Sequence, residues 1–386
     1  MLNQDDNILK FDIPEIIFGR GSLSKIGQCA ARLGGEKILV VTDPGIIEAG
    51  WVDKCLKYLK QERLRYVVYD NVVTNPRDFQ VDQGIALYRK KNCDVIVAIG
   101  GGSAIDTAKG IAILATNHGS VHEYAGCNLV HHPIPPLICV PTTAGTGADI
   151  SQFAVFLDFK EKTKRCVLSR AIMPDISLID PKLLTTLSTE MIAATGMDAL
   201  THAIEAYVSS LSWPMTNPHA IHAIELVGQH LVNATKTKDI TALEGMSIAS
   251  LEAGMAFSNA ILGAAHALAH PPGGLYDLHH GLINSVILPV VLDQNLSSAM
   301  PKYVYIAQAM GLELRGMKFE EAALHTPELV KKLIADLEIP THLSKLGADI
   351  KDIPIMAKMA QEDICMQTNP RSYSTKELED MYKEVW

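Results

Sequence analysis

Two helix-like segments and one later histidine carry the residues best suited to chemistry. The segment MDALTHAIEA contains Asp198 and His202, GAAHALAHPPGG contains His266 and His270, and His280 follows in LHHG. Residues four apart lie on one face of a helix, one turn above each other, so each pair can direct two ligand atoms at one point. Carboxylate and imidazole groups are ligands that suit divalent transition metals such as iron and zinc. The spacing therefore indicates a metal site.

The alternative interpretation is a structural cluster of hydrogen-bonded side chains. The chain contains 14 histidines, and most of them must be ordinary surface or core residues. The candidates, however, lie in alanine- and leucine-rich helical sequence, where an unpaired ionisable group is costly to bury. We therefore favour the metal site over the structural cluster.

Length and composition set the frame for this site. With 386 residues, of which 48% are hydrophobic and 20% charged, the chain is expected to form two globular domains. A net charge of −9 without a long basic cluster argues against nucleic acid or an anionic membrane as partner and favours small molecules. Three features of the sequence bear on the compartment. Residues 1–18 lack a leader-like basic and apolar pattern, and no apolar stretch approaches the ~20 residues of a membrane span. The seven cysteines form no CxxC. We expect a cytoplasmic protein.

Hydrophobic patterning divides the chain into two parts. Short β-branched runs predict buried parallel strands at residues 37–43, 65–70, 94–99, 136–140 and 176–180, with helices near 45–62, 76–92 and 103–117. This alternation predicts an open, mostly parallel α/β sheet. Beyond residue 180, long apolar stretches are interrupted by Pro214, Pro218, Pro271-Pro272, Pro289 and Pro340, and we expect helices that end before these prolines. We predict an α/β domain over 1–184 and an all-helical domain over 185–386.

The second informative motif is AIGGGSAIDTAKGIA, residues 98–112. A buried strand is expected to end at Ile99. The three glycines that follow, Gly100, Gly101 and Gly102, let the backbone turn and approach a ligand closely, and Ser103 is placed to cap a helix that begins at Ala104. Free N–H groups at the positive end of a helix suit a pyrophosphate. The motif is not the G-x-G-x-x-G fingerprint, and a tight turn without a ligand is the alternative. Its position at the carboxyl end of a strand favours the binding site.

Two further segments fit a dinucleotide. Asp43 ends the first predicted strand of the sheet, where a carboxylate can bind ribose hydroxyls and repel a 2′-phosphate. An aspartate that merely forms a turn before Pro44 explains the same residue equally well. The segment PTTAGTG follows another strand and offers the hydroxyls of Thr142 and Thr143 beside glycines, although an ordinary polar loop has the same composition.

Taken together, GGGSAIDTAK, PTTAGTG, MDALTHAIEAY and HALAHPPGGLYDLHHG resemble the metal-dependent, iron-containing (group III) alcohol dehydrogenases. The resemblance spans essentially the whole chain. It implies an N-terminal dinucleotide-binding α/β domain, a helical C-terminal domain of the dehydroquinate synthase-like architecture, and an active site in the cleft between them. It also implies that the protein forms homo-oligomers.

The resemblance assigns roles residue by residue. It makes Asp198, His202, His266 and His280 the metal ligands and places His270 near the nicotinamide. Gly101, Gly102 and Ser103 match the pyrophosphate turn, Thr142 and Thr143 the loop beside the cofactor, and Asp43 the position that favours NAD over NADP. A looser alignment brings Asn75 and Lys164 to the cofactor. The family commonly has proline before its last ligand, where this chain has His279, so His279 is an alternative to His280 as the ligand.

These residues predict an NAD-dependent oxidoreductase that transfers a hydride between NAD(H) and a short-chain primary alcohol or aldehyde. The metal polarises the substrate oxygen, and His270 is the candidate proton relay. Iron is implied by the resemblance, and the ligand set also accepts zinc. A carbocycle synthase that uses NAD and a metal is one alternative, but the basic residues that its phosphorylated substrate needs are scarce. A non-catalytic metal-binding protein leaves the glycine turn unexplained.

The substrate is less constrained by the sequence. Phe257, Asn259, Cys365, Arg371 and His279 are candidate pocket residues, although each is equally well explained as a packing residue. Arg371 and His279 would suit an anionic aldehyde such as sulfoacetaldehyde. We therefore keep an anionic aldehyde of two or three carbons as an alternative substrate.

Overall fold

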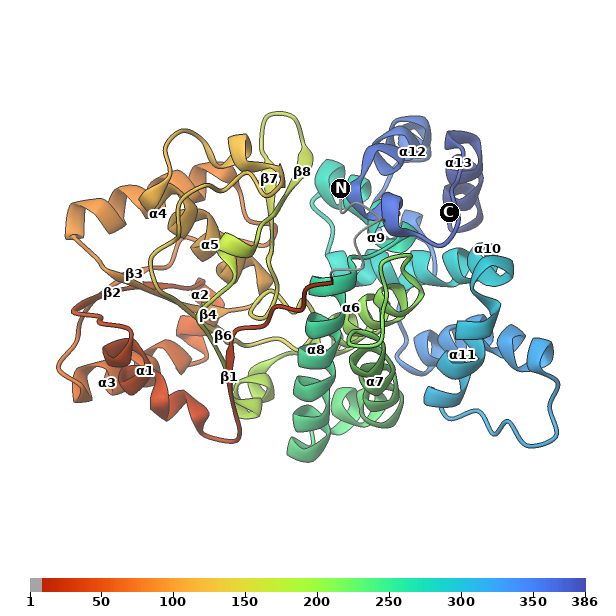
Figure 1. Ribbon diagram of the computed structural model, residues 1–386, viewed down its shortest axis with the longest axis horizontal. Coiled ribbons are helices and arrows are strands. Elements are labelled where there is room, and N and C mark those ends of the chain that lie inside the picture. The colour runs from red at the N-terminus through yellow and green to blue at the C-terminus, as the bar shows by residue number, and fades with distance from the viewer. Residues whose placement is uncertain (1–8) are drawn as a thin grey trace.

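The computed structural model describes residues 9–386. Residues 1–8, which belong to the predicted 1–184 domain and to the N-terminal stretch without a leader-like pattern, lie outside the described residues. Figure 1 shows two halves, with the sheet and its helices on the left and a set of helices on the right. The α/β class with a helical C-terminal region is thereby confirmed.

A six-stranded parallel sheet forms the first half, in the strand order β1-β9-β6-β4-β2-β3. All five predicted strands are present, as β2 (Lys37–Val41), β3 (Arg65–Tyr69), β4 (Val95–Gly100), β6 (Leu137–Pro141) and β9 (Ile176–Ile179). The central strand β4 is buried at every position because helices cover both faces of the sheet. From β2 the chain adds β3 on one side and then β4 on the other, so the order in which strands are added reverses between β2 and β4. Ligands of open α/β sheets bind at such a point.

The structure differs from the sequence prediction at several elements of this half. Strand β1 (Glu15–Phe18) and a separate three-stranded sheet of β5 (Gly126–Cys127), β7 (Phe153–Asp158) and β8 (Thr163–Leu168) were not predicted. The single helix expected near 45–62 is two helices, α2 (Pro44–Glu48) and α3 (Trp51–Gln61), because Gly50 adopts a left-handed φ of 77° between them. Helices α1 (Ile26–Arg32), α4 (Asp78–Lys91) and α5 (Gly102–Thr116) complete this half.

Residues 189–386 contain helices and no strand, as predicted. The helices are α6 (Thr189–Val208), α7 (Asn217–Thr237), α8 (Ile240–Ala260), α9 (Ala264–Tyr276), α10 (His280–Ala309), α11 (Phe319–Asp336), α12 (Ile353–Glu362) and α13 (Thr375–Glu384). Their small, buried alanine faces let α6, α7 and α8 pack closely into one hydrophobic core. The domain boundary near residue 184 falls in the 3₁₀ segment Pro181–Thr186 that links β9 to α6, and it stays a prediction.

The expectation that helices end before prolines is wrong at two places. Pro271 and Pro272 lie inside α9, and Pro289 lies inside α10. Proline at position 272 removes the donor that would bond the Leu268 carbonyl, and the hydroxyl of Tyr382 on α13 donates to that carbonyl at 2.6 Å instead. A tertiary contact thus replaces the lost backbone hydrogen bond, which no local sequence rule anticipates.

Within residues 9–386, no single helix is long and apolar enough to cross a membrane. Helices α8 and α9 meet the length and composition criterion as a pair, but they bend by 101° at the break between them.

Candidate active site between the sheet and the helices

A cavity of about 720 Å³ lies where the carboxyl ends of the sheet strands face the helical region. This volume falls in the usual range of small-molecule sites. The cavity brings together every residue predicted as a metal ligand, a cofactor contact or the proton relay: Asp43, Asn75, Gly101, Gly102, Ser103, Thr142, Thr143, Lys164, Asp198, His202, His266, His270 and His280. Their distances and partners decide what each can do.

The sheet side of the cavity is built by the ends of three adjacent strands. Asp43 follows β2, Gly101 follows β4, and Thr142 follows β6, and these strands are neighbours in the order β6-β4-β2. Parallel strands end at the same edge of a sheet, so the register of the sheet brings the three motifs together. The hydroxyl oxygens of Thr142 and Thr143 are buried and have no hydrogen-bond partner, as expected of groups that face a ligand.

The glycine turn packs closely against the threonine loop. A Cβ atom on Gly102 would lie 2.8 Å from Thr146 Cγ2, so a larger residue would push this loop away. Helix α5 begins at Gly102 with Gly101 as its N-cap, so the prediction that Ser103 caps a helix beginning at Ala104 is wrong. The extended backbone of Gly101 caps the helix without a side chain, and Ser103 lies in the first turn, facing the cavity. The first N–H groups of α5 have no partner within the helix and can bind an anion.

Asp43 both caps a helix and lines the cavity. Its Oδ1 accepts a hydrogen bond from Ile46 N at 3.1 Å and so caps α2, while the residue also lines the cavity. Burial raises the pKa of its carboxyl group, against the backbone hydrogen bonds of Ile46 and Gly45, which lower it. The carboxylate is thus held rigidly at the cavity wall.

Asn75 and Lys164 reach the cavity from a loop and from a strand, respectively. Asn75 has a left-handed φ of 54°, and its amide donates to Asp277 Oδ1 at 2.8 Å, in the loop before His280. Lys164 lies on β8, where burial lowers the pKa of its ammonium group to about 8 although Asp198, Asp277 and Asp106 oppose the shift. A Cβ on Gly273 would lie 2.8 Å from Lys164 Nζ, so the absence of a side chain at this position leaves room for the ammonium group.

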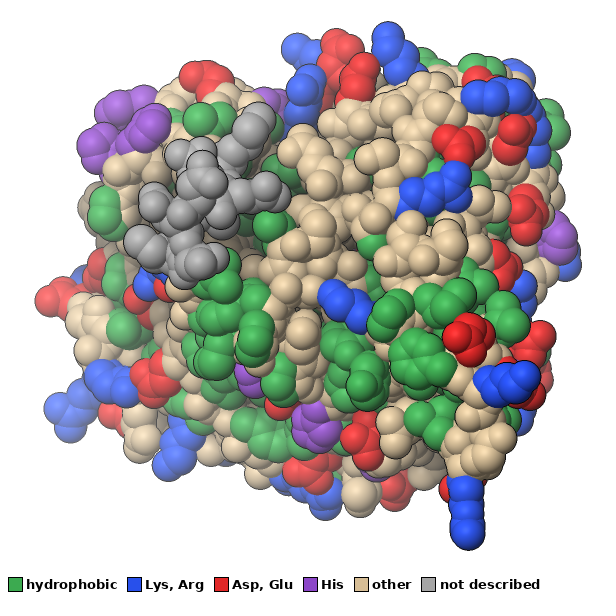
Figure 2. Space-filling view, turned by 45° about the vertical axis from the view of Figure 1, so that its right-hand side comes forward, with side chains coloured by type: hydrophobic (Ala, Val, Ile, Leu, Met, Phe, Trp, Pro, Cys, Tyr) green, Lys and Arg blue, Asp and Glu red, His purple; other side chains and the backbone are tan. Residues whose placement is uncertain are grey.

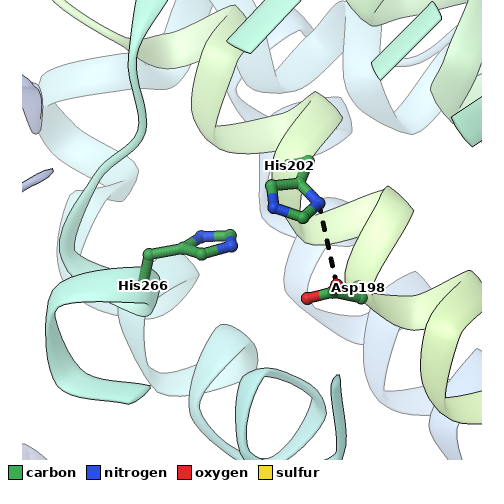
Figure 3. Close-up of side chains that lie close together, drawn as sticks. All are labelled: Asp198, His202 and His266. Carbon is green, nitrogen blue, oxygen red and sulfur yellow. Dashed lines mark ion pairs between the residues drawn. The ribbon is translucent and has the colours of Figure 1, made fainter. Parts of the chain in front are cut away.

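The side chains of Asp198, His202 and His266 converge on the helical side (Figure 3). One potential ligand atom from each lies within 4.8 Å of the others, and all three residues are at most 5% exposed. Asp198 and His202 lie one turn apart on α6, and Asp198 Oδ2 is 4.0 Å from His202 Nδ1. His266 comes from α9, and its ring centroid is 4.4 Å from that of His202.

The donor set fits a divalent cation. Burial lowers the pKa of His202 to about 4, although Asp198 opposes the shift, so its imidazole is neutral near pH 7 and free to donate a lone pair. His202 Nδ1 is buried and has no hydrogen-bond partner in the described chain. A buried nitrogen without a partner beside a carboxylate is what a bound cation would satisfy.

His280, rather than His279, approaches this cluster. His280 Nε2 lies 3.8 Å from Asp198 Oδ1, and its ring centroid is 5.2 Å from that of His266. His279 also lines the cavity but has no contact of this kind with Asp198. Burial lowers the pKa of both histidines, well below the usual value for His280. The geometry supports His280 as the fourth ligand.

His270 lies one turn beyond His266 and stacks on His280 with 5.5 Å between ring centroids. Its Nδ1 is bonded to Asp363 Oδ2 at 2.7 Å, which leaves Nε2 as the ring nitrogen outside this bond. The other carboxylate oxygen of Asp363, Oδ1, accepts a hydrogen bond from Cys365 N at 2.8 Å. Burial would raise the pKa of Asp363, but the interactions with His270 and Cys365 hold it below the usual value.

Sequence reasoning missed three residues of this site. Glu205 and Asp363 bind the Nδ1 atoms of His266 and His270, and the Asn284 amide lies 2.8 Å from Asp198 Oδ1. The helical spacing of Asp198, His202 and Glu205 could have revealed Glu205, and that of His280 and Asn284 could have revealed Asn284. Asp363 had no such signal, because it lies 93 positions from its partner.

The candidate substrate residues divide into two groups. Phe257, Cys365 and His279 line the cavity, whereas Asn259 and Arg371 do not. Asn259 bonds the backbone of Asp12, and Arg371 contacts Gln294 and Glu377. The hypothesis of an anionic substrate rested on Arg371 and His279, and of these two only His279 lines the cavity.

The family models decide the identity of this arrangement. The model for iron-containing alcohol dehydrogenase matches residues 14–181, and that for the C-terminal part of the Fe-containing alcohol dehydrogenase family matches residues 192–386. The chain belongs to the iron-containing alcohol dehydrogenase family. It is an oxidoreductase of alcohols and aldehydes, and its cofactors are NAD and iron. This identity favours the dehydrogenase hypothesis over the carbocycle synthase and the non-catalytic protein.

Relatives of this iron-containing alcohol dehydrogenase match over nearly their full length. A 1,3-propanediol dehydrogenase of Citrobacter freundii is 41% identical, with 97% of this chain and 98% of the relative covered. An NAD-dependent methanol dehydrogenase of Bacillus methanolicus is 35% identical, with 96% and 98% covered. The crystal structure of a 1,3-propanediol oxidoreductase superposes with a TM-score of 0.96 at 39% identity, covering 98% of this chain and all of the other.

Proposed function

We propose that this protein interconverts short-chain, uncharged primary alcohols and their aldehydes at the cavity between the sheet and the helices. The observation that carries the proposal is that one cavity holds both the cluster of Asp198, His202, His266 and His280 and the glycine turn at the start of α5. A metal site and a pyrophosphate site that share a cavity can bring an alcohol and a nicotinamide together.

The donor atoms of the cavity residues indicate which residues would hold iron and which would hold NAD. Asp198, His202, His266 and His280 would hold iron, and Gly101, Gly102, Ser103, Thr142 and Thr143 would hold the pyrophosphate and nicotinamide half of NAD, with Asp43, Asn75 and Lys164 along its length. When bound, iron supplies Lewis-acid polarisation of the substrate oxygen and NAD supplies the hydride acceptor.

His270 supplies the proton exchange. Its Nδ1–H is held by Asp363, so the lone pair of Nε2 is free to accept a proton during alcohol oxidation. Asp363 then stabilises the imidazolium, since the carboxylate is 2.7 Å from Nδ1. In aldehyde reduction the same nitrogen returns the proton.

The walls beyond the metal cluster favour an uncharged substrate. Val155, Leu157, Phe257 and Leu262 line this cavity, and Lys164 is the one lysine or arginine among the described residues that line it. Since the resemblance places Lys164 at the cofactor, no other lysine or arginine among the described residues lines the cavity to bind a sulfonate. The Citrobacter relative is named for 1,3-propanediol, which makes that diol the first substrate to test.

The test is oxidation of NADH by protein reconstituted anaerobically with ferrous iron, with metal-free protein as control. Acetaldehyde, 3-hydroxypropanal and sulfoacetaldehyde are compared by kcat/KM. Metal-dependent turnover that is fastest on the uncharged aldehydes supports the proposal. A preference for sulfoacetaldehyde would instead favour the anionic substrate.

We also propose that the protein works in the cytoplasm as a homo-oligomer. The helical region exposes several large hydrophobic side chains, Leu211, Met215, Tyr305, Phe319 and Leu324. Figure 2 shows hydrophobic side chains gathered on one face of the molecule, and clustered apolar surface commonly marks a contact between proteins. Analytical ultracentrifugation tests the assembly, since a monomer at micromolar concentration would contradict it.

A further inference from the structure

Glu205 lies on the face of α6 that carries Asp198 and His202. The three residues are spaced by four and three positions, so they follow one another along a single helix face. The Glu205 side chain is 3% exposed. A carboxylate buried this deeply is costly unless hydrogen bonds satisfy its oxygens.

The start of α9 supplies those hydrogen bonds. Ala265 N donates to Glu205 Oε1 at 2.6 Å, and His266 N donates to Oε2 at 3.3 Å. Helix α9 has Gly263 as its N-cap, which has no side chain to cap the helix. Two side chains from elsewhere take over this role: Asn369 Oδ1 accepts from Ala264 N at 3.1 Å, and Glu205 on α6 accepts from the next two N–H groups. A Cβ on Gly263 would lie 2.8 Å from Glu205 Oε1, which explains a glycine at this position.

The same carboxylate also holds the imidazole of His266. Glu205 Oε2 lies 2.6 Å from His266 Nδ1. Because a carboxylate can only accept, Nδ1 must carry the proton, and the lone pair of the ring is placed on Nε2. The amide nitrogen of Asn284 is 3.2 Å from His266 Nε2 and 2.8 Å from Asp198 Oδ1, so Nε2 faces a donor at the centre of the cluster.

We propose that Glu205 is a positioning residue that fixes the tautomer and orientation of His266, so that Nε2 points at the metal position. The same carboxylate also accepts hydrogen bonds from the first turn of α9. It therefore holds α9, which carries His266, at a fixed separation from α6, which carries Asp198 and His202. The inference rests on the proposed function, because it takes His266 as a metal ligand.

The test measures the affinity of the metal-free, full-length protein for Co²⁺ by competition with a chelator, together with the visible absorption of the bound ion. Glu205→Gln keeps an acceptor oxygen but removes the charge, whereas Glu205→Leu removes both. We expect affinity to fall about tenfold in the first variant and about 100-fold in the second, with a changed Co²⁺ spectrum. Glu252→Gln is the matched control, since Glu252 pairs with His219 and His222 outside the cavity.

His266→Ala separates this inference from the proposed function. If it abolishes Co²⁺ binding while both Glu205 variants bind normally, the positioning role is overturned and the ligand assignment stands. Equal losses in Glu205→Gln and Glu205→Leu would show an effect of charge alone and would also overturn positioning. Normal binding by His266→Ala overturns the ligand assignment and the inference together.

Folding of each variant is followed by circular dichroism. Should Glu205→Leu fail to fold, Glu205→Asp replaces it, because the shorter side chain keeps the charge but withdraws it from His266 Nδ1. Weaker Co²⁺ binding in Glu205→Asp supports positioning, and unchanged binding overturns it.

Discussion

The imidazole of His270 is bonded through Nδ1 to the carboxylate of Asp363 at 2.7 Å, although 93 positions separate the two residues. The contact joins α9 to the 3₁₀ segment Ile364–Thr368, for which Asp363 is the N-cap. It engages Nδ1 and leaves Nε2 of His270 outside this bond, in a residue that lines the cavity.

Asp363→Asn should lower kcat about tenfold or more, with a smaller effect on KM. If the asparagine oxygen keeps its bond to Cys365 N, the NH₂ group faces His270 Nδ1 and favours the tautomer that is protonated on Nε2. That tautomer cannot accept the proton of the alcohol. Steady-state kinetics of the single variants and of the double variant with His270→Ala test this, since additive losses would contradict a shared role.

His280→Ala should lose bound iron, whereas His279→Ala should retain it. The reason is that His280 Nε2 lies 3.8 Å from Asp198 Oδ1, and His279 has no contact of this kind. The iron content per chain, measured by mass spectrometry after reconstitution, decides between them. If His280→Ala retained iron and His279→Ala lost it, His279 would be the ligand instead of His280.

Asp43→Ser should raise kcat/KM for NADPH relative to NADH by about tenfold, because a carboxylate next to a 2′-phosphate is repulsive. Serine is chosen because it can still cap α2, where Asp43 now accepts from Ile46 N. Asp70→Ser at the exposed end of β3 serves as the control. An unchanged preference in Asp43→Ser would show that another residue selects the cofactor.

Asp106→Asn should stabilise the cofactor-free protein at pH 7 and less so at pH 5. Burial raises the pKa of Asp106 from 3.8 to about 6, with Lys109 and Val155 N opposing the shift. The folded state therefore binds more protons than the unfolded state between these values, and stability falls as pH rises through that window. Asparagine can still accept from Val155 N but carries no charge. Thermal unfolding at both pH values measures the difference, and a pH-independent difference would contradict it.

Local patterns in the sequence determined much of this protein. Short β-branched runs predicted the strands around β4, because burial on both faces selects such residues. The four-residue spacing of Asp198 and His202 and of His266 and His270 is a property of one helix, so it can be read without knowing the fold. The same holds for the glycine turn after β4.

Tertiary structure alone decided how these parts meet. Strand order placed Asp43, Gly101 and Thr142 at one edge of the sheet, and the crossing of α6 and α9 brought His266 to Asp198. Asp363 reaches His270, and Tyr382 reaches the carbonyl that Pro272 leaves free, over 93 and 114 positions of the chain. Such contacts depend on packing between distant segments, and no periodicity or local propensity encodes them.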